Sequence, residues 1–433
     1  MKKKINYTIK DFGMVKVFLL CIGLFFLSSC SQKKASVENV SNISAKEILG
    51  NPEYQAISYG GYRHSTRDKQ PSIEELKEDM KILSAMGIKL LRTYNVQLPH
   101  AGNVLKAIES LKAEDPGFEM YVMLGAWIDC KNAWTDLPPD HNVESEQNSG
   151  EIDRAVSLAN QYKDIVKVIA VGNEAMVKWA ASYYVQPDVI LKWVNHLQKL
   201  KKDGILPSDL WITSSDNFAS WGGGGEEYHV PALDSLIMAV DYISLHTYPM
   251  HDTHYNSDFW LNASDKGEGK NDEEEIIDAM ERAKTYAQTQ YNAVAEYVAK
   301  LGVEKQLHIG ETGWASFSDG HYGPEGSRAC DEYKQALYYK HMREWTNKEN
   351  ISCFFFEAFD ENWKDAGNPN GSENYFGLFT IDGKAKYVVW DLVDKGTFNG
   401  LKRGGQPITK TFEGKEDEVM KTVLNPMEAV VVH

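Results

Sequence analysis

Short apolar runs alternate with amphipathic segments along most of this chain. Eight of the apolar runs have the length and composition of β-strands, at residues 55–61, 88–95, 119–127, 166–174, 210–217, 241–249, 306–312 and 351–360. Each run is apolar almost throughout, as expected of parallel strands that are buried on both faces. The segments between most of them carry apolar residues at the helical period, so the pattern predicts strands alternating with helices.

Signals at the helix ends support this interpretation. Ser72 and Glu75 form a capping box, and the helix that they begin should end at Gly87. A long helix is expected at about 273–300, and residues 378–396 could supply the last helix. Eight repeats of strand and helix predict an α/β fold, a (β/α)8 TIM barrel over residues 49–396, with its active site at the C-terminal ends of the strands. The connection between the fifth and sixth strands is the least regular.

Both ends of the chain are predicted to lie outside the barrel. Lysines at positions 2, 3, 4, 10 and 16 precede an apolar run at 17–27, which is short for a bilayer span of about 20 residues. Residues 1–29 therefore read as a signal peptide. Residues 30–48 read as a polar tether, and the turn-rich residues 397–433 as a C-terminal extension that packs on the barrel through a few short strands.

The end of the signal peptide adds a modification site. Leu27-Ser28-Ser29-Cys30 resembles the signal of bacterial lipoproteins, in which the cysteine is lipidated and becomes the mature N-terminus. This resemblance implies lipidation of Cys30 and anchoring to a bacterial membrane by lipid alone. We expect the outer membrane, at its periplasmic or cell-surface face. A plain secretory signal is the alternative.

Charge and cysteine content narrow the possible partners. The net charge of −16 argues against a nucleic-acid partner, because phosphate binding needs clustered lysine and arginine. Cys130, Cys330 and Cys353 remain outside the signal, which allows one disulfide and a free thiol, or none. Their spacing is not that of a metal site, and His246 and His251 are expected to be structural. We expect no metal and no organic cofactor.

Two acidic residues lie at the C-terminal ends of predicted strands, where barrel enzymes have their catalytic residues. Asn173-Glu174 ends the fourth strand, and Glu311 ends the seventh within HIGETGWAS. Either acid alone could be a salt-bridged structural residue. Two carboxylates directed into one cleft are what glycoside hydrolysis requires, one as nucleophile and the other as general acid and then base.

Three stretches carry a family resemblance. VGNEA at 171–175, IGETGWAS at 309–316 and FEAFDENWKDAGNPNGSENYFGLF at 356–379 resemble the signatures of glycoside hydrolase family 17, the β-1,3-glucanases or laminarinases. The resemblance covers roughly residues 50–396. The chain departs from the family at Ala315, where proline is usual, and in long insertions after the third and sixth strands.

The resemblance implies roles for individual residues. Glu174 would be the general acid/base and Glu311 the nucleophile of a retaining mechanism with a covalent glycosyl-enzyme intermediate, and Asn173 would bind the sugar 2-hydroxyl. Glu361, Lys364 and Glu373 match a charged cluster beside the nucleophile, in which the lysine would keep Glu311 ionised.

Aromatic residues are expected to line the cleft. Tyr248 is placed to hydrogen-bond Glu311, Tyr59 and Tyr94 end the first two strands, and Trp314 and Trp363 follow the seventh and eighth. Further tryptophans lie on or beside the same rim, at positions 127, 134, 179, 221 and 260. Each is as compatible with core packing as with sugar contact, but together they suggest a cleft for several glucose units.

The preferred hypothesis is a lipid-anchored, retaining glycosidase that cleaves laminarin-like β-1,3-glucan, with endo action favoured over exo. A β-1,3-glucan transglycosylase would use the same site and intermediate. A non-catalytic glycan-binding lipoprotein is disfavoured because it has no need of Glu174 and Glu311. A barrel glycosidase for another glycan, such as a β-mannanase, is disfavoured by the motif from Glu373 to Phe379.

Overall fold

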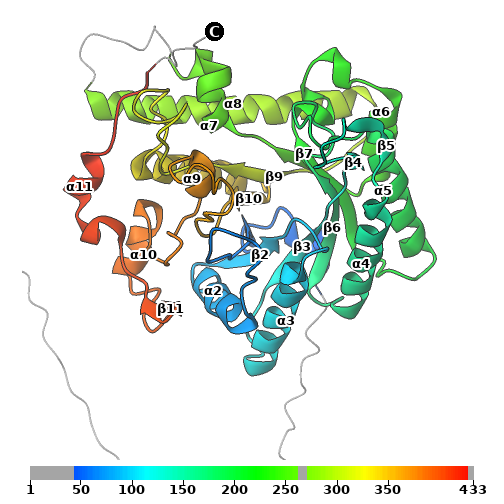
Figure 1. The fold of residues 1–433 in the computed structure, drawn as a ribbon, viewed down its shortest axis with the longest axis horizontal. Helices are drawn as coiled ribbons and strands as arrows, with labels where there is room; N and C mark the ends of the chain where they lie inside the picture. The colour runs from blue at the N-terminus through cyan, green and yellow to red at the C-terminus, as the bar shows by residue number, and fades with distance from the viewer. Residues whose placement is uncertain (1–42, 262–270, 428–433) are drawn as a thin grey trace, which may run out of the picture. The chain divides into compact units, whose positions relative to one another are not determined.

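Eight parallel strands close into a barrel in the computed structural model, which describes residues 43–261 and 271–427 (Figure 1). The barrel strands are β1 (Gln55–Ser58), β2 (Ile88–Arg92), β3 (Tyr121–Ala126), β6 (Val166–Asn173), β7 (Trp211–Asn217), β8 (Ile243–His246), β9 (Leu307–Gly313) and β10 (Cys353–Phe356). Neighbours around the barrel follow chain order, and β10 pairs with β1 to close it. The predicted (β/α)8 barrel is confirmed.

Helices lie around the barrel strands. They are α2 (Ile73–Ala85), α3 (Pro99–Glu114), α4 (Gln147–Gln161), α5 (Pro187–Lys202), α6 (Pro231–Ala239), α7 (Pro249–Tyr255), α8 (Asp272–Lys300), α9 (Glu332–Lys348) and α10 (Trp390–Asp394). The capping box predicted at Ser72 and Glu75 is present at the start of α2. The last helix is much shorter than the predicted 378–396, because only a 3₁₀ turn (Tyr387–Val389) precedes α10.

The inside of the barrel is filled near its N-terminal end. Ala56, Leu90, Met123, Val168 and Phe354 point inward and form one buried cluster with the short helix α1 (Ala45–Ile48). Ala45 and Ile48 are fully buried. The prediction of a tether reaching residue 48 is therefore wrong at its end, because α1 is part of the folded unit.

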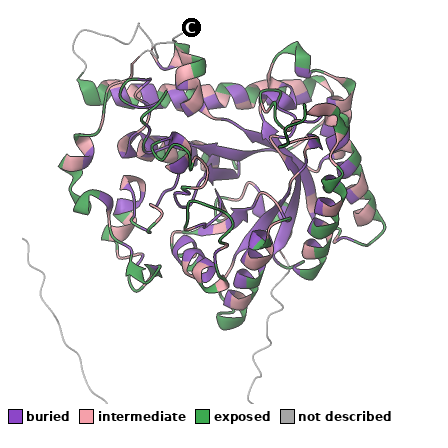
Figure 2. Cartoon of the chain, in the orientation of Figure 1, coloured by how far each residue is buried: buried purple, intermediate pink, exposed green. Residues whose placement is uncertain are grey.

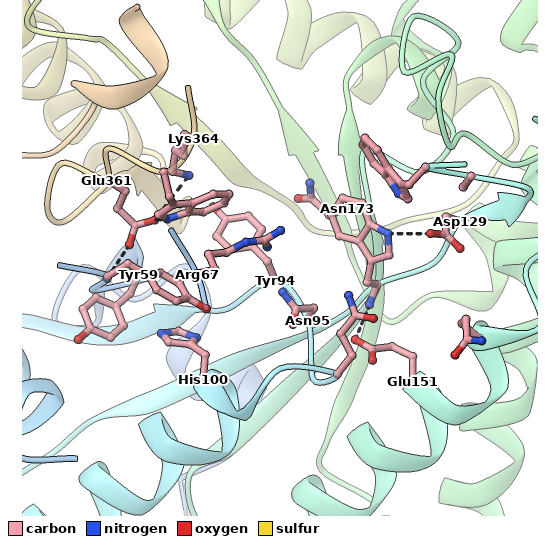
Figure 3. A pocket seen from close by; sticks show the side chains of 18 of the residues that line it. Tyr59, Arg67, Tyr94, Asn95, His100, Asp129, Glu151, Asn173, Glu361 and Lys364 are labelled. Atoms are coloured by element: carbon pink, nitrogen blue, oxygen red, sulfur yellow. Dashed lines mark hydrogen bonds and ion pairs between the residues drawn. The ribbon is translucent and has the colours of Figure 1, made fainter. Parts of the chain in front are cut away.

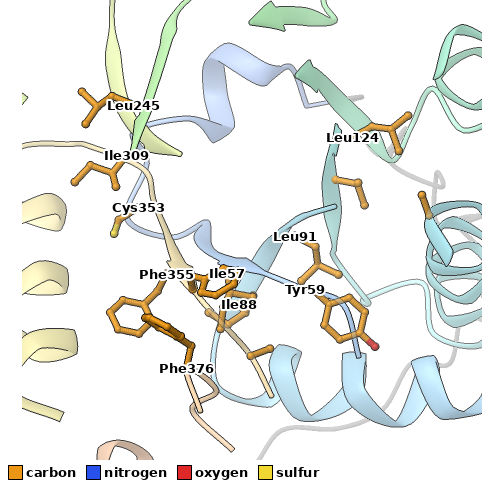
Figure 4. Close-up of a cluster of buried hydrophobic side chains, with 14 of the residues drawn as sticks. Ile57, Tyr59, Ile88, Leu91, Leu124, Leu245, Ile309, Cys353, Phe355 and Phe376 are labelled. Atoms are coloured by element: carbon orange, nitrogen blue, oxygen red, sulfur yellow. The ribbon is translucent and has the colours of Figure 1, made fainter. Parts of the chain in front are cut away.

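A second and larger apolar cluster separates the strands from the helices. Ile57, Leu91, Leu124 and Phe355 follow the inward-pointing residues by one position and so face outward into this layer (Figure 4). The strands are buried almost throughout, whereas the helices expose their outer faces (Figure 2). This packing leaves the C-terminal strand ends as the place where polar side chains meet.

Two additions decorate this framework. After β3, an insertion forms the hairpin of β4 (Cys130–Lys131) and β5 (Asp140–Glu144). The C-terminal extension forms the hairpin of β11 (Lys402–Arg403) and β12 (Gln406–Pro407), followed by α11 (Glu416–Met420). Its buried Arg403 contacts Asp79 of α2, with 2.9 Å between Nε and Oδ1.

Several predictions concern residues that the structure does not describe. The signal peptide at 1–29, the lipidation site Cys30 and most of the tether lie outside the described residues. Within residues 43–261 and 271–427, no helix combines the length and apolarity that a membrane crossing needs. Cys130, Cys330 and Cys353 carry free thiols.

Candidate active site

Glu311 lies in β9 and is surrounded by hydrogen-bond donors from the ends of two other strands, β2 and β8. The buried Arg92, at the end of β2, forms an ion pair with its Oε2. The hydroxyl of Tyr94 donates to the same oxygen at 2.9 Å. The hydroxyl of Tyr248, just after β8, donates to Oε1 at 2.6 Å, the contact that the sequence predicted. Both carboxylate oxygens are therefore held in fixed directions.

These partners decide the charge of Glu311. Burial alone would raise its pKa, but the Arg92 guanidinium opposes burial, and with His246 and the two tyrosine hydroxyls it lowers the pKa to about 2. Burial and the charge of Glu311 raise the pKa of Tyr94 and of Tyr248 well above the usual value, so both remain hydroxyl donors. Glu311 is an ionised carboxylate across the whole physiological range.

The glycine before Glu311 has a steric reason. A Cβ at Gly310 would lie 2.1 Å from the Ser244 hydroxyl oxygen and 2.5 Å from that of Ser215, so no side chain fits there. The Gly310 carbonyl accepts a hydrogen bond from Arg92 at 3.1 Å. The Ile-Gly-Glu motif thus makes room for a polar layer beneath the carboxylate.

Glu174 directly follows β6, three strands away from β9 around the barrel. Its φ of 46° lies in the left-handed region, as does that of Gly172 at 83°. Its backbone N–H donates to the Ser215 carbonyl at 3.0 Å. This turn re-aims the side chain, which keeps a quarter of its surface exposed.

The side chain of Glu174 has a histidine partner. Nδ1 of the buried His246 lies 3.1 Å from its Oε1, and Nε2 of the same ring is hydrogen-bonded to the Ser215 hydroxyl at 2.7 Å. The turn itself is held by Asp216, which accepts from the Met176 N–H at 2.7 Å. Burial raises the pKa of Asp216 to about 7.

Arg92 joins the two strand ends. Besides its ion pair with Glu311, its second terminal nitrogen donates to the side-chain oxygen of Asn173, the residue before Glu174. Asn173 is therefore fixed with its amide nitrogen free for another acceptor. One buried cation orients the candidate nucleophile and the candidate sugar-binding amide.

Two cavities meet at Glu311. The first has a volume of about 770 Å³, is lined by Asn173 and Tyr94, and reaches Glu361 and Lys364 on one side and Asp129 on the other (Figure 3). Trp127 and Trp363 also line it. The second has a volume of about 730 Å³ and is lined by Glu174. Both include Glu311 and Phe356, so space for a ligand exists on two sides of the carboxylate.

The charged cluster after β10 is present, but it is arranged differently from the prediction. Nζ of Lys364 lies 3.5 Å from Glu357 and 3.9 Å from Glu361. Glu361 also accepts hydrogen bonds from the Tyr62 N–H and the Trp363 indole. Arg92, and not Lys364, is the cation in contact with Glu311. Lys364 pairs with these two buried carboxyls and is attracted to Glu311 only from a longer distance.

The remaining member of the cluster lines the second cavity. Glu373 lies 3.5 Å from Nε2 of His251 in α7. Burial opposes both charged forms, but each charge favours the other, so the pKa of Glu373 is lowered and that of His251 is raised. This ion pair lies on the side of the cleft that carries Glu174.

Four of the aromatic residues predicted on or beside the cleft are fully buried, namely Tyr59, Trp221, Trp260 and Trp314. Tyr59 is fully buried, although it forms part of the wall of the first cavity, and its hydroxyl donates to Asp79 (Figure 4). Trp314 is also fully buried, packs against Tyr338 with ring centroids 4.9 Å apart, and donates to the Ala329 carbonyl. Trp314 lines neither cavity, so the predicted sugar contact is not available to it, whereas Tyr59 forms part of the wall of the first cavity without an exposed surface.

Two residues of the site, Arg92 and His246, were not predicted from the sequence to belong to it. Arg92 ends the apolar run IKLLR, and a lone cation at a barrel strand end was the available signal. His246 was expected to be structural, yet it contacts Glu174. Nothing in the sequence near either residue shows which acid it meets, because the partners come from other strands. Among the described residues, no group of three or more His, Cys, Asp or Glu is arranged to hold a metal.

Comparison with protein-family models matches residues 56–377 to the BtgE/BtgC glycoside hydrolase domain. The chain is 24% identical to the putative glucan endo-1,3-beta-glucosidase btgC of Aspergillus niger over 70% of its length, and it spans 37% of that relative. It is 25% identical to a glucan 1,3-beta-glucosidase of Arthroderma benhamiae, covering 72% of this chain and 83% of the relative.

Solved structures include a much closer match. An endo-laminarinase from Formosa Hel1_33_131 is 65% identical, with a TM-score of 0.87, and the match covers 90% of this chain and all of that one. A Rhizomucor miehei beta-1,3-glucanosyltransferase, solved with laminaritriose, shares the fold at 19% identity and a TM-score of 0.53, over 78% of this chain and 96% of its own.

Proposed function

Because the chain belongs to the BtgE/BtgC glycoside hydrolase family, we propose that it hydrolyses β-1,3-glucan with retention of anomeric configuration. The observation that carries the proposal is the contrast between two carboxyls in one cleft. Glu311 is held ionised by Arg92 and two hydroxyls, whereas Glu174 is partly exposed beside His246. A nucleophile and a proton-exchanging group need these two environments.

The first step forms a covalent intermediate. A carboxylate oxygen of Glu311 attacks the anomeric carbon, and the bond from that carbon to the linking oxygen breaks as Glu174 donates its proton to that oxygen. The leaving chain departs with a free hydroxyl, and Glu174 becomes a carboxylate. Glu311 loses its negative charge as it becomes an ester, so the hydrogen bonds that it accepts from Tyr94 and Tyr248 weaken.

The second step restores the enzyme. Glu174, now ionised, removes a proton from a water molecule, whose oxygen attacks the anomeric carbon from the face that the leaving chain vacated. The ester bond to Glu311 breaks, and the carboxylate returns to its place beside Arg92. Two inversions give a product with the starting β configuration.

The substrate class and the mode of cleavage have separate support. The endo-laminarinase that is 65% identical over nearly the whole chain favours laminarin-like β-1,3-glucan. The net charge of −16 suits a neutral polysaccharide better than a polyanion. Endo action is supported by the cavities on both sides of Glu311, which leave room for glucose units on either side of the cleaved bond.

A product time course tests the proposal. The purified domain is incubated with unbranched β-1,3-glucan, mixed-linkage glucan and mannan, and the first product is followed by proton NMR. We expect a ladder of shortening β-1,3 oligomers whose new reducing ends appear first as the β anomer. An α anomer first would refute retention. Glucose alone from the outset would refute endo action, and binding without cleavage would favour the glycan-capturing lipoprotein.

Transglycosylation is the second candidate for the same site. The second cavity, which holds Glu174, is lined by aromatic residues such as Trp179, Tyr255 and Tyr322, and these surfaces suit a sugar acceptor in place of water. Oligomers longer than the starting chain, formed at high oligosaccharide concentration, would identify this activity in the same experiment.

Anchoring by lipid is proposed on the sequence alone. The apolar run at 17–27 and the tetrapeptide ending in Cys30 support it. Expression in a bacterial host with labelled palmitate should label the wild-type chain and leave Cys30→Ser unlabelled, and the wild type should fractionate with the outer membrane. Equal labelling of both chains would refute lipidation at Cys30.

A further inference from the structure

Three aromatic rings from separate segments form a surface at one end of the first cavity. Trp127 follows β3, Trp134 lies in the β4–β5 insertion, and Tyr183 lies in the loop after β6. The Trp134 and Tyr183 rings are stacked, with centroids 5.0 Å apart and planes at 21°. Trp127 lies 5.2 Å from Tyr183 and 6.3 Å from Trp134. We call these three rings the aromatic platform.

The platform is held rigidly by contacts between the two segments that carry it. The Cys130 N–H donates to the Tyr183 carbonyl at 3.0 Å, and the Gln186 N–H donates to the His141 carbonyl at 3.3 Å. The His141 ring stacks on Tyr184 with a centroid distance of 3.6 Å. The insertion is thus fastened to the loop that follows Glu174, and the rings are in place before any ligand arrives.

Trp134 carries two features that packing does not explain. Its side chain is 63% exposed, which leaves the ring face away from Tyr183 open to the cavity. Its backbone has a φ of 62°, an unfavourable conformation for a bulky residue. Stacking on Tyr183 covers one face of the ring, so a ligand that uses the other face is the better explanation for an exposed tryptophan in this strained turn.

The position of the platform relates it to the sugar chain, and this step rests on the proposed function. Asn173, the proposed partner of the 2-hydroxyl, lies on the same side of the first cavity as Asp129, whose carboxylate accepts from the Trp127 indole at 3.3 Å (Figure 3). Arg67, Glu361 and Lys364 lie on the opposite side (Figure 3). In a β-1,3 chain the next unit is attached at the 3-hydroxyl, the ring position beside the 2-hydroxyl.

The side of the cleaved bond follows from the two glutamates. The leaving group must lie beside the proton donor Glu174, which lines the second cavity and not the first. The first cavity therefore receives the part of the chain that becomes attached to Glu311, on its non-reducing side.

We propose that the aromatic platform, with Trp134 as its outer ring, is a distal subsite that binds a glucose unit on the non-reducing side of the cleaved bond. The flat C–H face of a β-linked glucose stacks on the open face of Trp134. The platform makes cleavage favour β-1,3 chains long enough to reach it.

Trp134→Gly tests the proposal without a folding defect, because glycine adopts a φ of 62° readily. Activity is measured on laminari-oligosaccharides of three to seven units, labelled with ¹⁸O at the reducing end. For the wild type we expect kcat/KM to rise with chain length. The variant should lose about tenfold of kcat/KM on the longest oligosaccharide, equivalent to about 1.4 kcal/mol, with a smaller loss on the shortest. Its cleavage sites should move toward the non-reducing end.

Trp179 offers a matched control. It is 61% exposed, close to the value for Trp134, but it lines the second cavity with Glu174. Trp179→Ala should move cleavage toward the reducing end. An unchanged cleavage pattern in Trp134→Gly, or the same shift in both variants, would overturn the platform proposal. If the wild type cleaves none of the oligosaccharides, the proposed function itself fails.

Discussion

Glu311 and Glu174 end two strands of one barrel, yet they have opposite surroundings. Glu311 is nearly buried and contacts a guanidinium and two hydroxyls. Glu174 keeps 25% of its side chain exposed and contacts one histidine. The same residue type is thus held as an anion by a buried guanidinium at one strand end and left partly exposed beside a histidine at the other. The difference comes from partners on β2 and β8, not from the acids themselves.

Removing the carboxylate charge at β9 should have the largest effect. Glu311→Gln keeps the shape of the side chain, but it replaces one acceptor oxygen by an NH2 donor and cannot form the ester, so kcat on β-1,3-glucan should fall by about 10⁴-fold or more. Glucan binding should change little, whereas the free energy of unfolding should fall by a few kcal/mol, about as in Arg92→Met, because the buried guanidinium loses its ion-pair partner. A variant that keeps most of its activity would refute the nucleophile assignment.

Glu174→Gln should cause a kinetic defect that depends on the leaving group, and this dependence distinguishes the role of Glu174 from that of Glu311. Loss of general acid catalysis should lower kcat/KM on glucan by about 10²–10⁴-fold. An aryl β-laminaribioside with an acidic phenol needs no proton for departure, so its first step should lose far less. With Glu174→Ala, added azide should yield a β-glycosyl azide, whereas Glu311→Ala should yield the α product. The reverse stereochemistry would exchange the two roles.

Arg92→Met should make Glu311 behave like an ordinary buried acid. In the wild type the pKa of Glu311 is lowered to about 2, so its charge persists as pH falls well below the ordinary carboxyl pKa. Without Arg92, burial is opposed only by His246 and the two tyrosine hydroxyls, so that pKa should rise and the acidic limb of kcat/KM should move up by about 1–3 pH units. Unfolding of this variant should cost about 3–5 kcal/mol less at neutral pH.

The low pKa of Glu311 also makes the stability of the folded protein depend on pH. A carboxyl whose pKa is lowered on folding stabilises the native state above its ordinary pKa, and this contribution is lost as pH falls from about 4.5 toward 2. The free energy of unfolding, measured by denaturation at a series of pH values across that window, should therefore decrease more steeply with falling pH for the wild type than for Glu311→Gln. Parallel curves would show that Arg92 does not hold Glu311 ionised.

His246→Ala should have the smallest effect, because it acts through Glu174. Loss of one hydrogen bond to a carboxylate should lower kcat/KM on glucan by about tenfold. His246→Asn places an amide near the position of Nδ1 and should recover most of that loss. The defect should nearly disappear on the activated aryl glycoside. An equal loss on both substrates would indicate that His246 supports the fold and not the acid.

The sequence predicted the architecture well for a physical reason. Parallel strands buried on both faces must be apolar throughout, so each barrel strand left a visible run, and the acids that interrupt those runs marked the C-terminal rim. The predictions were weaker for residues beyond the strand ends. Tyr59 and Trp314 follow strands as Tyr94 and Tyr248 do, but only the last two point at Glu311.

By itself, the order of apolar runs determined the barrel, and the two glutamates at strand ends determined where its chemistry should lie. Only the tertiary structure decided which cation meets Glu311, which ring meets Glu174, and which tryptophans remain exposed. Periodicity reports which face of an element is buried, and that property is local to the element. The charge and direction of a side chain in the barrel mouth depend on neighbours from other strands, such as Arg92, which lies more than two hundred residues before Glu311.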